Sequence, residues 1–239
     1  MISMQAISDW IRREVEESGA NGAVFGLSGG LDSSVVGVLC KKALGERCLG
    51  VIMPCHSAKS DIEDAKEVAR LFEIQTKIID LSSIFDSFVD LLQDISKIAR
   101  ANIKPRLRMI TLYAFANDMG YIVVGTGNKS ELSVGYFTKY GDGGVDILPL
   151  AGIYKTDLPP LARELGIPER IIGKPPSAGL WDGQTDEGEM GISYEELDAV
   201  LKSLESGTCD TGDEKVQKVR SMVERSTHKR TQPKSFSFG

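Results

Sequence analysis

Cysteine and histidine are scarce in this chain. Only four cysteines, at positions 40, 48, 55 and 209, and two histidines occur among 239 residues. The cysteine spacings match no pattern of zinc ligands, and two histidines add little to them. The sequence therefore predicts reduced, mostly buried thiols and no zinc site.

An excess of basic residues and a long apolar run are also absent. The net charge is -6, so a polyanion is repelled on average and a nucleic-acid partner is not expected. No apolar run reaches the length that spans a membrane. Residues 1–17 are amphipathic and charged, which does not fit a signal peptide. We expect a cytoplasmic protein without a membrane partner.

Two common nucleotide-binding motifs are missing from the glycine-rich stretch at residues 26–30. No Gly-Lys-Ser/Thr follows it, as a Walker loop requires, and its spacing does not fit the Gly-x-Gly-x-x-Gly of dinucleotide-binding folds. The stretch therefore needs another explanation.

The order of the expected elements predicts an α/β fold. Short apolar runs alternate with amphipathic helical patterns, which favours a doubly wound, mostly parallel sheet with helices on both faces and further helices at the C-terminal end. We expect a single domain over residues 1–239, since no shift of composition marks a second one. The expected strands are 22–27, 48–53, 77–81 and 121–125. The expected helices are 2–18, a helix to about 44, 60–72, several over 83–118, 156–165 capped by Thr156, 193–205 and 212–226.

Residues 26–34 read as a strand end, a tight loop and a helix start, which is a phosphate-binding arrangement. Glycines let the backbone approach an anion closely, and serine hydroxyls add donors. Asp32 is informative, because a carboxylate beside bound phosphates repels them unless a cation lies between. The loop therefore implies Mg²⁺. The alternative is an ordinary Gly-Ser turn between a strand and a helix.

A second strand ends at the glycine-rich residues 125–128, and ligands of open α/β sheets lie outside the carboxyl ends of strands. We expect this loop to lie beside the loop at Ser28. Glu131 is then a candidate second carboxylate for Mg²⁺, although it could simply stabilise the start of a helix. Two long loops, 135–152 and 173–191, lack periodicity, and the second is a candidate mobile lid.

Several basic residues could either act in a binding site or simply be exposed charges on the surface. Lys155 lies beside the expected helix start at Thr156 and could stabilise charge on a phosphate. The others are Arg106, Arg108, Lys139, Lys174 and residues 228–230.

These segments resemble the ammonia-dependent NAD synthetase family of the ATP pyrophosphatase superfamily. The stretch Ser-Gly-Gly-Leu-Asp-Ser at residues 28–33 fits the superfamily signature. The family resemblance adds Gly-Thr-Gly-Asn-Lys-Ser-Glu at 125–131, Gly-Tyr-Phe-Thr-Lys-Tyr-Gly-Asp-Gly-Gly at 135–144, Lys-Pro-Pro-Ser-Ala at 174–178 and His-Lys-Arg at 228–230. It implies a Rossmann-like fold of the adenine nucleotide alpha hydrolase type.

The resemblance also implies a reaction, the last step of NAD biosynthesis. The nicotinate carboxylate of deamido-NAD attacks the α-phosphorus of ATP, giving an acyl-adenylate and pyrophosphate, and ammonia then displaces AMP to form NAD. Glutamine-dependent relatives carry an extra amidase domain, and this chain has no room for one. Free ammonia, or ammonia delivered by a separate protein, is therefore the expected donor, and Asp146 or Asp182 is a candidate for the proton acceptor.

Roles for individual residues follow from the resemblance. Asp32 and Glu131 would hold Mg²⁺ and act in catalysis with Lys155. Deamido-NAD would contact Arg106, Lys139, Asp146, His228 and Lys229. ATP would contact Gly26, Leu27, Ser28, Gly29, Gly30, Leu31, Asp32, Ser33, Thr126, Lys155 and Ser177. A homodimer with deamido-NAD at the subunit interface is implied as well.

Other classes remain as alternatives. A GMP synthetase subunit would lack the Phe-Thr-Lys-Tyr loop at residues 137–140, and a tRNA-modifying adenylating enzyme would be expected to show a basic surface. A non-catalytic nucleotide-binding protein would bind ATP without needing both Asp32 and Glu131.

Overall fold

Four strands form one parallel sheet, in the order β3-β2-β1-β4, in the computed structural model, which describes residues 3–181 and 183–236. They are β1 (Gly22–Gly26), β2 (Cys48–Ile52), β3 (Thr76–Ile78) and β4 (Tyr121–Val124). All three pairings are parallel, and the winding reverses between β1 and β4. The predicted doubly wound parallel sheet is therefore confirmed.

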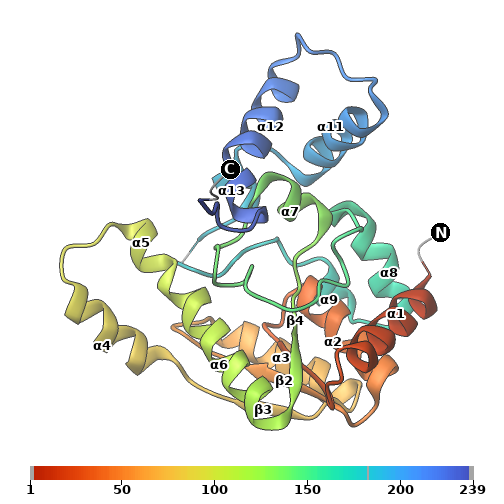
Figure 1. Cartoon of the computed structure of the whole chain (residues 1–239), viewed down its shortest axis with the longest axis vertical. Helices are drawn as coiled ribbons and strands as arrows, with labels where there is room; N and C mark the ends of the chain where they lie inside the picture. Colours follow the sequence, from red (N-terminus) through yellow and green to blue (C-terminus); the bar gives the residue numbers. More distant parts are fainter. Residues whose placement is uncertain (1–2, 182, 237–239) are drawn as a thin grey trace.

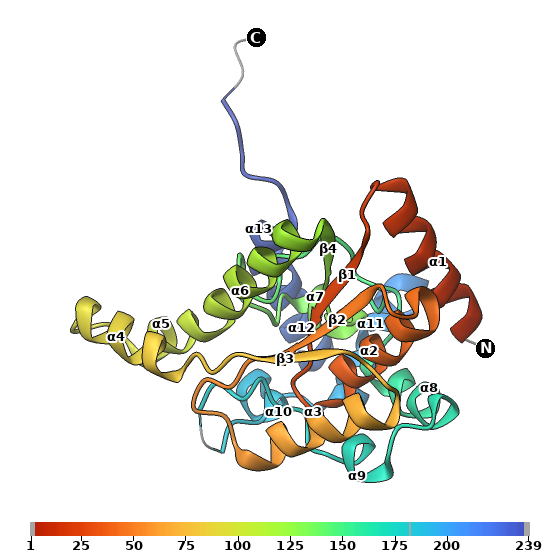
Figure 2. The ribbon, with the colours of Figure 1, turned by 90° about the horizontal axis from the view of Figure 1, so that it is seen from below.

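Helices cover both faces of the sheet, as Figure 2 shows from below. The side chains of β1 alternate between the two faces: Ala23 and Phe25 belong to one apolar cluster and Val24 to the other. The first face is covered by α1 (Met4–Glu17), α2 (Leu31–Leu44), α3 (Lys59–Leu71) and α8 (Leu158–Leu165). The second face is covered by α4 (Ser82–Leu92) and α6 (Ile103–Met119), with the short α5 (Lys97–Ala101) between them. Strands buried on both faces explain the continuous apolar runs of the sequence.

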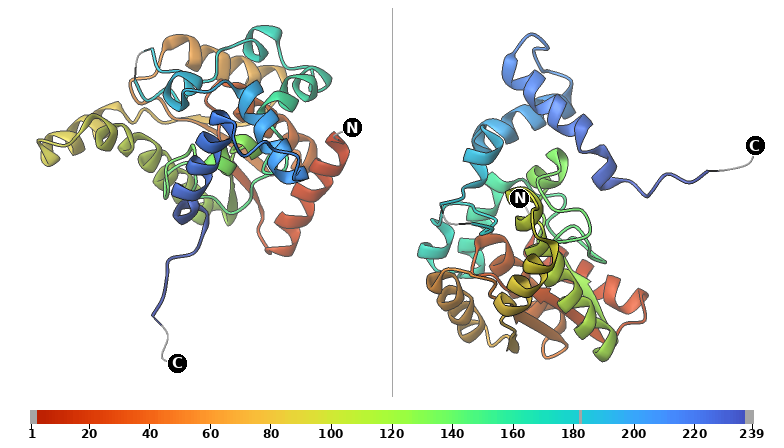
Figure 3. Two further views of the ribbon diagram at one scale, coloured as in Figure 1. Left: turned by 90° about the horizontal axis from the view of Figure 1, so that it is seen from above. Right: turned by 90° about the vertical axis from the view of Figure 1, so that its left-hand side faces the viewer.

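Further helices form a third, smaller layer beyond the carboxyl end of β4 (Figure 1). They are α7 (Lys129–Val134), α11 (Tyr194–Ser206), α12 (Glu214–Arg225) and α13 (Thr227–Arg230). The short α10 (Asp186–Met190) contributes Met190 to the apolar cluster of this layer. Val134, Leu197 and Val219 are among the buried residues that join them. After Arg230 the chain extends away from the body (Figure 3).

Two local predictions are wrong. Thr156 does not cap a helix: it lies in a 3-10 turn (Lys155–Asp157) before α8, because its hydroxyl is taken by Asp198 of α11. The segment 173–191 is not loop throughout, since it contains α10, whose N-cap Thr185 accepts a hydrogen bond from the Gly188 N–H. The short α9 (Glu169–Ile172) was also not expected.

The other expected elements are present within a few residues of their predicted ends. Pro105 lies in the first turn of α6, and Pro159 and Pro160 lie in the first turn of α8, where a proline removes no intrahelical hydrogen bond. None of the helices in the described part of the chain is both long and apolar enough to cross a membrane.

Candidate functional site

The ends of β1 and β4 meet where the winding of the sheet reverses. The loop after β1 leads into α2, and the loop after β4 leads into α7. The side-chain amide of Asn128 donates a hydrogen bond of 2.9 Å to Asp32, which joins the two loops directly. The two glycine-rich loops thus lie side by side at the crevice where open α/β sheets bind ligands, as the sequence predicts.

The first loop is organised around its serines and Gly29. The Ser28 and Ser33 hydroxyls lie 2.9 Å apart, and the Ser33 hydroxyl also donates to the Gly30 carbonyl at 3.0 Å. Gly29 has a φ of +83°, and a Cβ there would lie 2.2 Å from the Asp61 carbonyl oxygen. Only glycine lets α3 pack this closely against the loop. The loop ends at the N-terminus of α2, where amide groups and the helix dipole favour an anion.

Lys155 lies between two carboxylates at the mouth of this loop. Its Nζ donates to Asp32 Oδ2 and lies 3.6 Å from Glu131 Oε1. All three side chains are largely buried, with 9%, 17% and 18% of the Lys155, Asp32 and Glu131 side chains exposed. Glu131 also completes a capping box with Asn128 at the start of α7. Glu131 can therefore both stabilise the start of α7 and serve as a candidate metal ligand, because the capping box fixes a carboxyl group that faces Asp32.

The charges of this cluster are unbalanced. Burial, with Asp32 and Asp186 nearby, raises the pKa of Glu131 to about 8 despite the opposing charge of Lys155. Burial alone would lower the pKa of Lys155, but Asp32 and Glu131 outweigh it and raise that pKa. One lysine thus lies among three carboxyl groups, and a further cation bound there would favour release of the Glu131 proton.

The carboxylate pair suits Mg²⁺ held jointly with a phosphate ligand. No group of three or more His, Cys, Asp or Glu side chains that could hold a metal ion occurs in residues 3–181 and 183–236. Mg²⁺ usually takes only one or two protein carboxylates and completes its shell with phosphate oxygens and water. Asp32 and Glu131, beside a loop whose geometry suits a phosphate, fit that requirement.

Glu131→Gln should stabilise the ligand-free protein, and the gain should grow with pH. The raised pKa means that folded Glu131 keeps its proton between about pH 4.5 and 8, while the unfolded chain has already lost it. Unfolding therefore releases a proton, and stability falls as the pH rises through this window. Melting temperatures of the two proteins from pH 5 to 9 without Mg²⁺ measure the effect. A constant difference would contradict the raised pKa.

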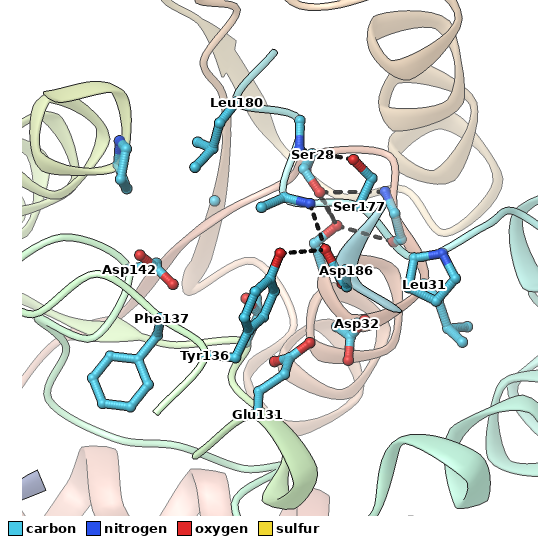
Figure 4. A pocket seen from close by; sticks show the side chains of 18 of the residues that line it. Ser28, Leu31, Asp32, Glu131, Tyr136, Phe137, Asp142, Ser177, Leu180 and Asp186 are labelled. Carbon is cyan, nitrogen blue, oxygen red and sulfur yellow. Dashed lines mark hydrogen bonds between the residues drawn. The ribbon is translucent and has the colours of Figure 1, made fainter. Parts of the chain in front are cut away.

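A cavity of about 1080 Å³ opens beside the cluster. It runs from the loop after β1 past the end of β2 and α6, and the loop 135–145 and the segment 172–181 close its sides. Figure 4 shows Asp32, Glu131 and Asp186 grouped at one end of it. This volume is at the upper end of small-molecule sites, so the cavity has room for a nucleotide and part of a second substrate.

Most of the predicted site residues line this cavity. Gly29 does not, since it packs against α3. The lining set comprises Gly26, Leu27, Ser28, Gly30, Leu31, Asp32, Ser33, Thr126, Glu131, Lys155, Ser177 and Lys229.

Four of the residues predicted for deamido-NAD do not line the cavity. Three of them lie together: Arg106 donates to the Lys139 carbonyl at 3.3 Å, and Lys139 Nζ donates to the His228 carbonyl. Asp146 is separate, and its carboxylate accepts from the Val123 N–H (2.7 Å) and the Tyr113 hydroxyl (2.9 Å). Asp146 thereby fixes the end of β4. Asp182 lies outside the described residues.

Arg108 is a candidate site residue that the sequence does not distinguish from a solvated arginine. This half-buried residue lines the cavity, and its Nε donates to the Met53 carbonyl at 3.3 Å. No carboxylate lies within ion-pair distance of it among the described residues. In the sequence, Arg108 comes four residues before the apolar Leu112, and this spacing places both side chains on the same face of α6.

The candidate lid lies over the cavity and is held at several points. Lys174 pairs with Asp61 (2.6 Å) and Asp64 (2.7 Å) of α3. Lys104 Nζ donates to the Leu180 carbonyl at 2.9 Å, and Lys97 Nζ lies 4.5 Å from the centre of the Trp181 ring. The segment from 174 to 181 is thus anchored to α3 on one side and to α5 and α6 on the other.

Comparison with known proteins gives consistent matches. A family model described as NAD synthase matches residues 3–233. A protein named NH(3)-dependent NAD(+) synthetase from Archaeoglobus fulgidus is 53% identical over 233 residues, covering 96% of this chain and 94% of that protein. The structure of an NMN synthetase from Francisella tularensis has a TM-score of 0.91 at 36% identity, covering 98% of this chain and 97% of that one. An NH3-dependent NAD synthetase from Campylobacter jejuni has a TM-score of 0.84 at 30% identity, covering 99% and 100%.

These matches extend over nearly the whole chain and agree with the motifs of the sequence. They give no support to a GMP synthetase subunit, a tRNA-modifying enzyme or a non-catalytic nucleotide-binding protein. The chain belongs to the NAD synthase family.

Proposed function

We propose that this protein is an ammonia-dependent NAD synthetase. The nicotinate carboxylate of deamido-NAD attacks the α-phosphorus of ATP and expels pyrophosphate, and ammonia attacks the resulting acyl-adenylate. AMP leaves, one proton is released, and NAD is formed. The observation that carries this proposal is the pair of carboxylates bridged by Lys155 beside the loop after β1, in a cavity with room for a nucleotide and part of a second substrate.

The triphosphate of ATP would lie on residues 26–33, with Thr126 and Ser177 at its sides. Lys155 would turn toward the α-phosphate and stabilise the charge that develops there. Asp32 and Glu131 would hold Mg²⁺, which when bound neutralises phosphate charge and aids the departure of pyrophosphate. The protein residues then orient the reacting groups, since neither step requires a covalent enzyme intermediate.

Arg108 is proposed to bind the adenosine end of ATP, because it lines the cavity beside the end of β2. Arg108→Met should raise the KM for ATP about tenfold or more, the usual cost of losing a charge-assisted hydrogen bond. Arg106→Met is the matched control, since Arg106 lies two residues away but outside the cavity. Steady-state kinetics with each substrate varied separate the two. Equal effects of both variants on the KM for ATP would contradict this role for Arg108.

Deamido-NAD would occupy the part of the cavity near Lys229, whose Nζ fixes the loop 135–145 through the carbonyls of Gly135 (2.7 Å) and Phe137 (2.8 Å). Arg106, Lys139, Asp146 and His228 remain predicted contacts. The first two and His228 lie outside the cavity of one chain, which supports a homodimer whose interface completes the substrate site.

The surface of α4 and α5 supports the same proposal. Large apolar side chains are exposed there, including Leu91 (79%), Ile98 (66%) and Ile84 (55%). Several exposed apolar side chains on neighbouring helices are typical of a protein interface, and we place a second copy of the chain on them. Leu91→Asp should convert the dimer to a monomer and lower turnover. Light scattering and the activity assay test this, and a wild-type protein that is monomeric while active would contradict it.

Free ammonia is proposed as the nitrogen donor, with residues 1–239 acting as one synthetase domain. The relatives named NH(3)-dependent are matched over most of their own length. We also place the enzyme in the cytoplasm. Turnover with glutamine equal to that with ammonium chloride would contradict the choice of donor.

The decisive experiment follows NAD, AMP and pyrophosphate together from purified protein, Mg-ATP, deamido-NAD and ammonium chloride. Equal amounts of all three products are expected. Because the chain is also similar to an NMN synthetase, the assay is repeated with nicotinate mononucleotide in place of deamido-NAD. The higher identity to NAD synthetases favours the dinucleotide, and a higher kcat/KM for the mononucleotide would overturn that choice.

A further inference from the structure

One buried aspartate holds the backbone on both sides of Ser177. The Asp186 N–H donates to the Pro176 carbonyl at 3.1 Å, and its carboxylate accepts from the Ala178 N–H at 3.0 Å. Asp186 is only 4% exposed. Ser177, expected to contact ATP, therefore lies between two hydrogen bonds to the same residue.

Two tyrosines from other elements fix the same carboxylate. The hydroxyls of Tyr136 and Tyr194 each lie 3.1 Å from it, one on each oxygen. The Tyr136 hydroxyl also lies 2.8 Å from Glu189 Oε2, so it is shared between the two carboxylates. Tyr136 belongs to the loop after α7, and Tyr194 begins α11. Figure 4 shows Asp186 between Tyr136 and the Ser177 segment. The lid is thus connected to two parts of the site that are distant in sequence.

Tyr194 extends this connection to the carboxylate cluster. Its hydroxyl is 3.3 Å from Glu131 Oε1 as well as 3.1 Å from Asp186 Oδ2. A single hydroxyl hydrogen can serve only one acceptor at full strength, so the hydroxyl couples the positions of the two carboxylates. Moving Asp186 changes the hydrogen bond available to Glu131.

A buried carboxylate is costly unless several donors compensate it, and an apolar residue of similar size would fill this space without that cost. The groups within hydrogen-bond distance of the Asp186 carboxylate come from three separate segments: the Ala178 N–H from the lid, and two shared tyrosine hydroxyls from the loop after α7 and from α11. We propose that Asp186 is the positioning residue of the lid, which holds Ser177 over the phosphate loop for ATP and, through Tyr194, orients Glu131. This inference rests on the proposed function for its role in turnover, but its effect on ATP binding does not depend on that reaction.

Electrostatics and positioning predict opposite effects of neutralising Asp186. ATP is an anion, so removing a nearby negative charge by itself should tighten its binding. Loss of positioning should weaken it. Glu195→Gln is the matched control for charge, because Glu195 lines the same cavity but is exposed.

The test measures the Kd for Mg-ATP by calorimetry on the full chain, together with kcat, KM and melting temperature. Asp186→Asn should weaken Mg-ATP binding about tenfold, while Glu195→Gln should leave it unchanged or tighten it. Tyr194→Phe should keep the Kd within about threefold and lower kcat about tenfold, since it removes the connection to Glu131 and one donor to Asp186 but leaves the hydrogen bonds of Asp186 to the backbone of Pro176 and Ala178.

Three results would overturn the proposal. One is Mg-ATP binding by Asp186→Asn that is as tight as in the wild type. Another is a normal kcat in Tyr194→Phe. The third is a loss of Mg-ATP binding or of kcat that disappears when each variant is assayed well below its own melting temperature, because such a loss comes from destabilisation of the fold alone. If the wild type binds Mg-ATP but makes no NAD, the proposed function fails while the binding result still decides the role of Asp186 in the lid.

Discussion

Asp32→Asn is expected to lower kcat about 10²–10³-fold, the usual effect of removing one electrostatic group aimed at a reacting phosphate. The substitution keeps the size of the side chain and an oxygen that can still accept from Asn128. It removes the charge that attracts Lys155 and that would hold Mg²⁺. The loss should be accompanied by a higher Mg²⁺ concentration for half-maximal rate. The assay is the formation of NAD and AMP at varied Mg²⁺.

Asp157→Asn is the matched control for this variant. Asp157 lies two residues after Lys155, is partly exposed, and pairs with Lys202 at 3.7 Å outside the cavity. Its rate should stay within about twofold of the wild type, as for most surface substitutions. A near-normal rate of Asp32→Asn at saturating Mg²⁺ would remove the metal role from Asp32.

Lys155→Met should have an effect of similar size for a different reason. Without the ammonium group, Asp32 and Glu131 face each other in a buried place with no cation between them. Breaking a buried ion pair on one side costs about 3 kcal/mol or more, so the melting temperature of the ligand-free protein should fall. Turnover should fall about 10²–10³-fold, because the side chain proposed to stabilise charge on the α-phosphate is lost.

Added Mg²⁺ distinguishes this explanation from general damage to the fold. A divalent cation between the two carboxylates should raise the melting temperature of Lys155→Met more than that of the wild type, where the lysine already serves them. Lys129→Met is the control, since Lys129 is an ion-paired lysine of the adjacent helix, with Glu205 at 2.7 Å, and does not line the cavity. Equal responses of wild type and Lys155→Met to Mg²⁺ would indicate that the cation binds elsewhere.

The sequence alone was sufficient for the sheet, its phosphate loop and the family. Apolar runs, helical periodicity and the glycines and serines at residues 26–34 are local patterns, and the rule that ligands lie at the carboxyl ends of strands places Glu131 near Asp32. The chemical role of Lys155 stays a prediction, and the turn that holds this residue differs from the helix start that the sequence predicts.

The tertiary structure decided which side chains meet. Arg106 and Arg108 look alike in the sequence, but only Arg108 lies on the cavity face of α6. Thr156 resembles a helix cap until Asp198, 42 residues later, takes its hydroxyl. Asp186 looks like one acid among several in a polar loop, yet packing buries it against Tyr136 and Tyr194. Local patterns report which conformation a segment prefers, whereas the energy of a buried charge or hydroxyl depends on partners that only long-range packing supplies.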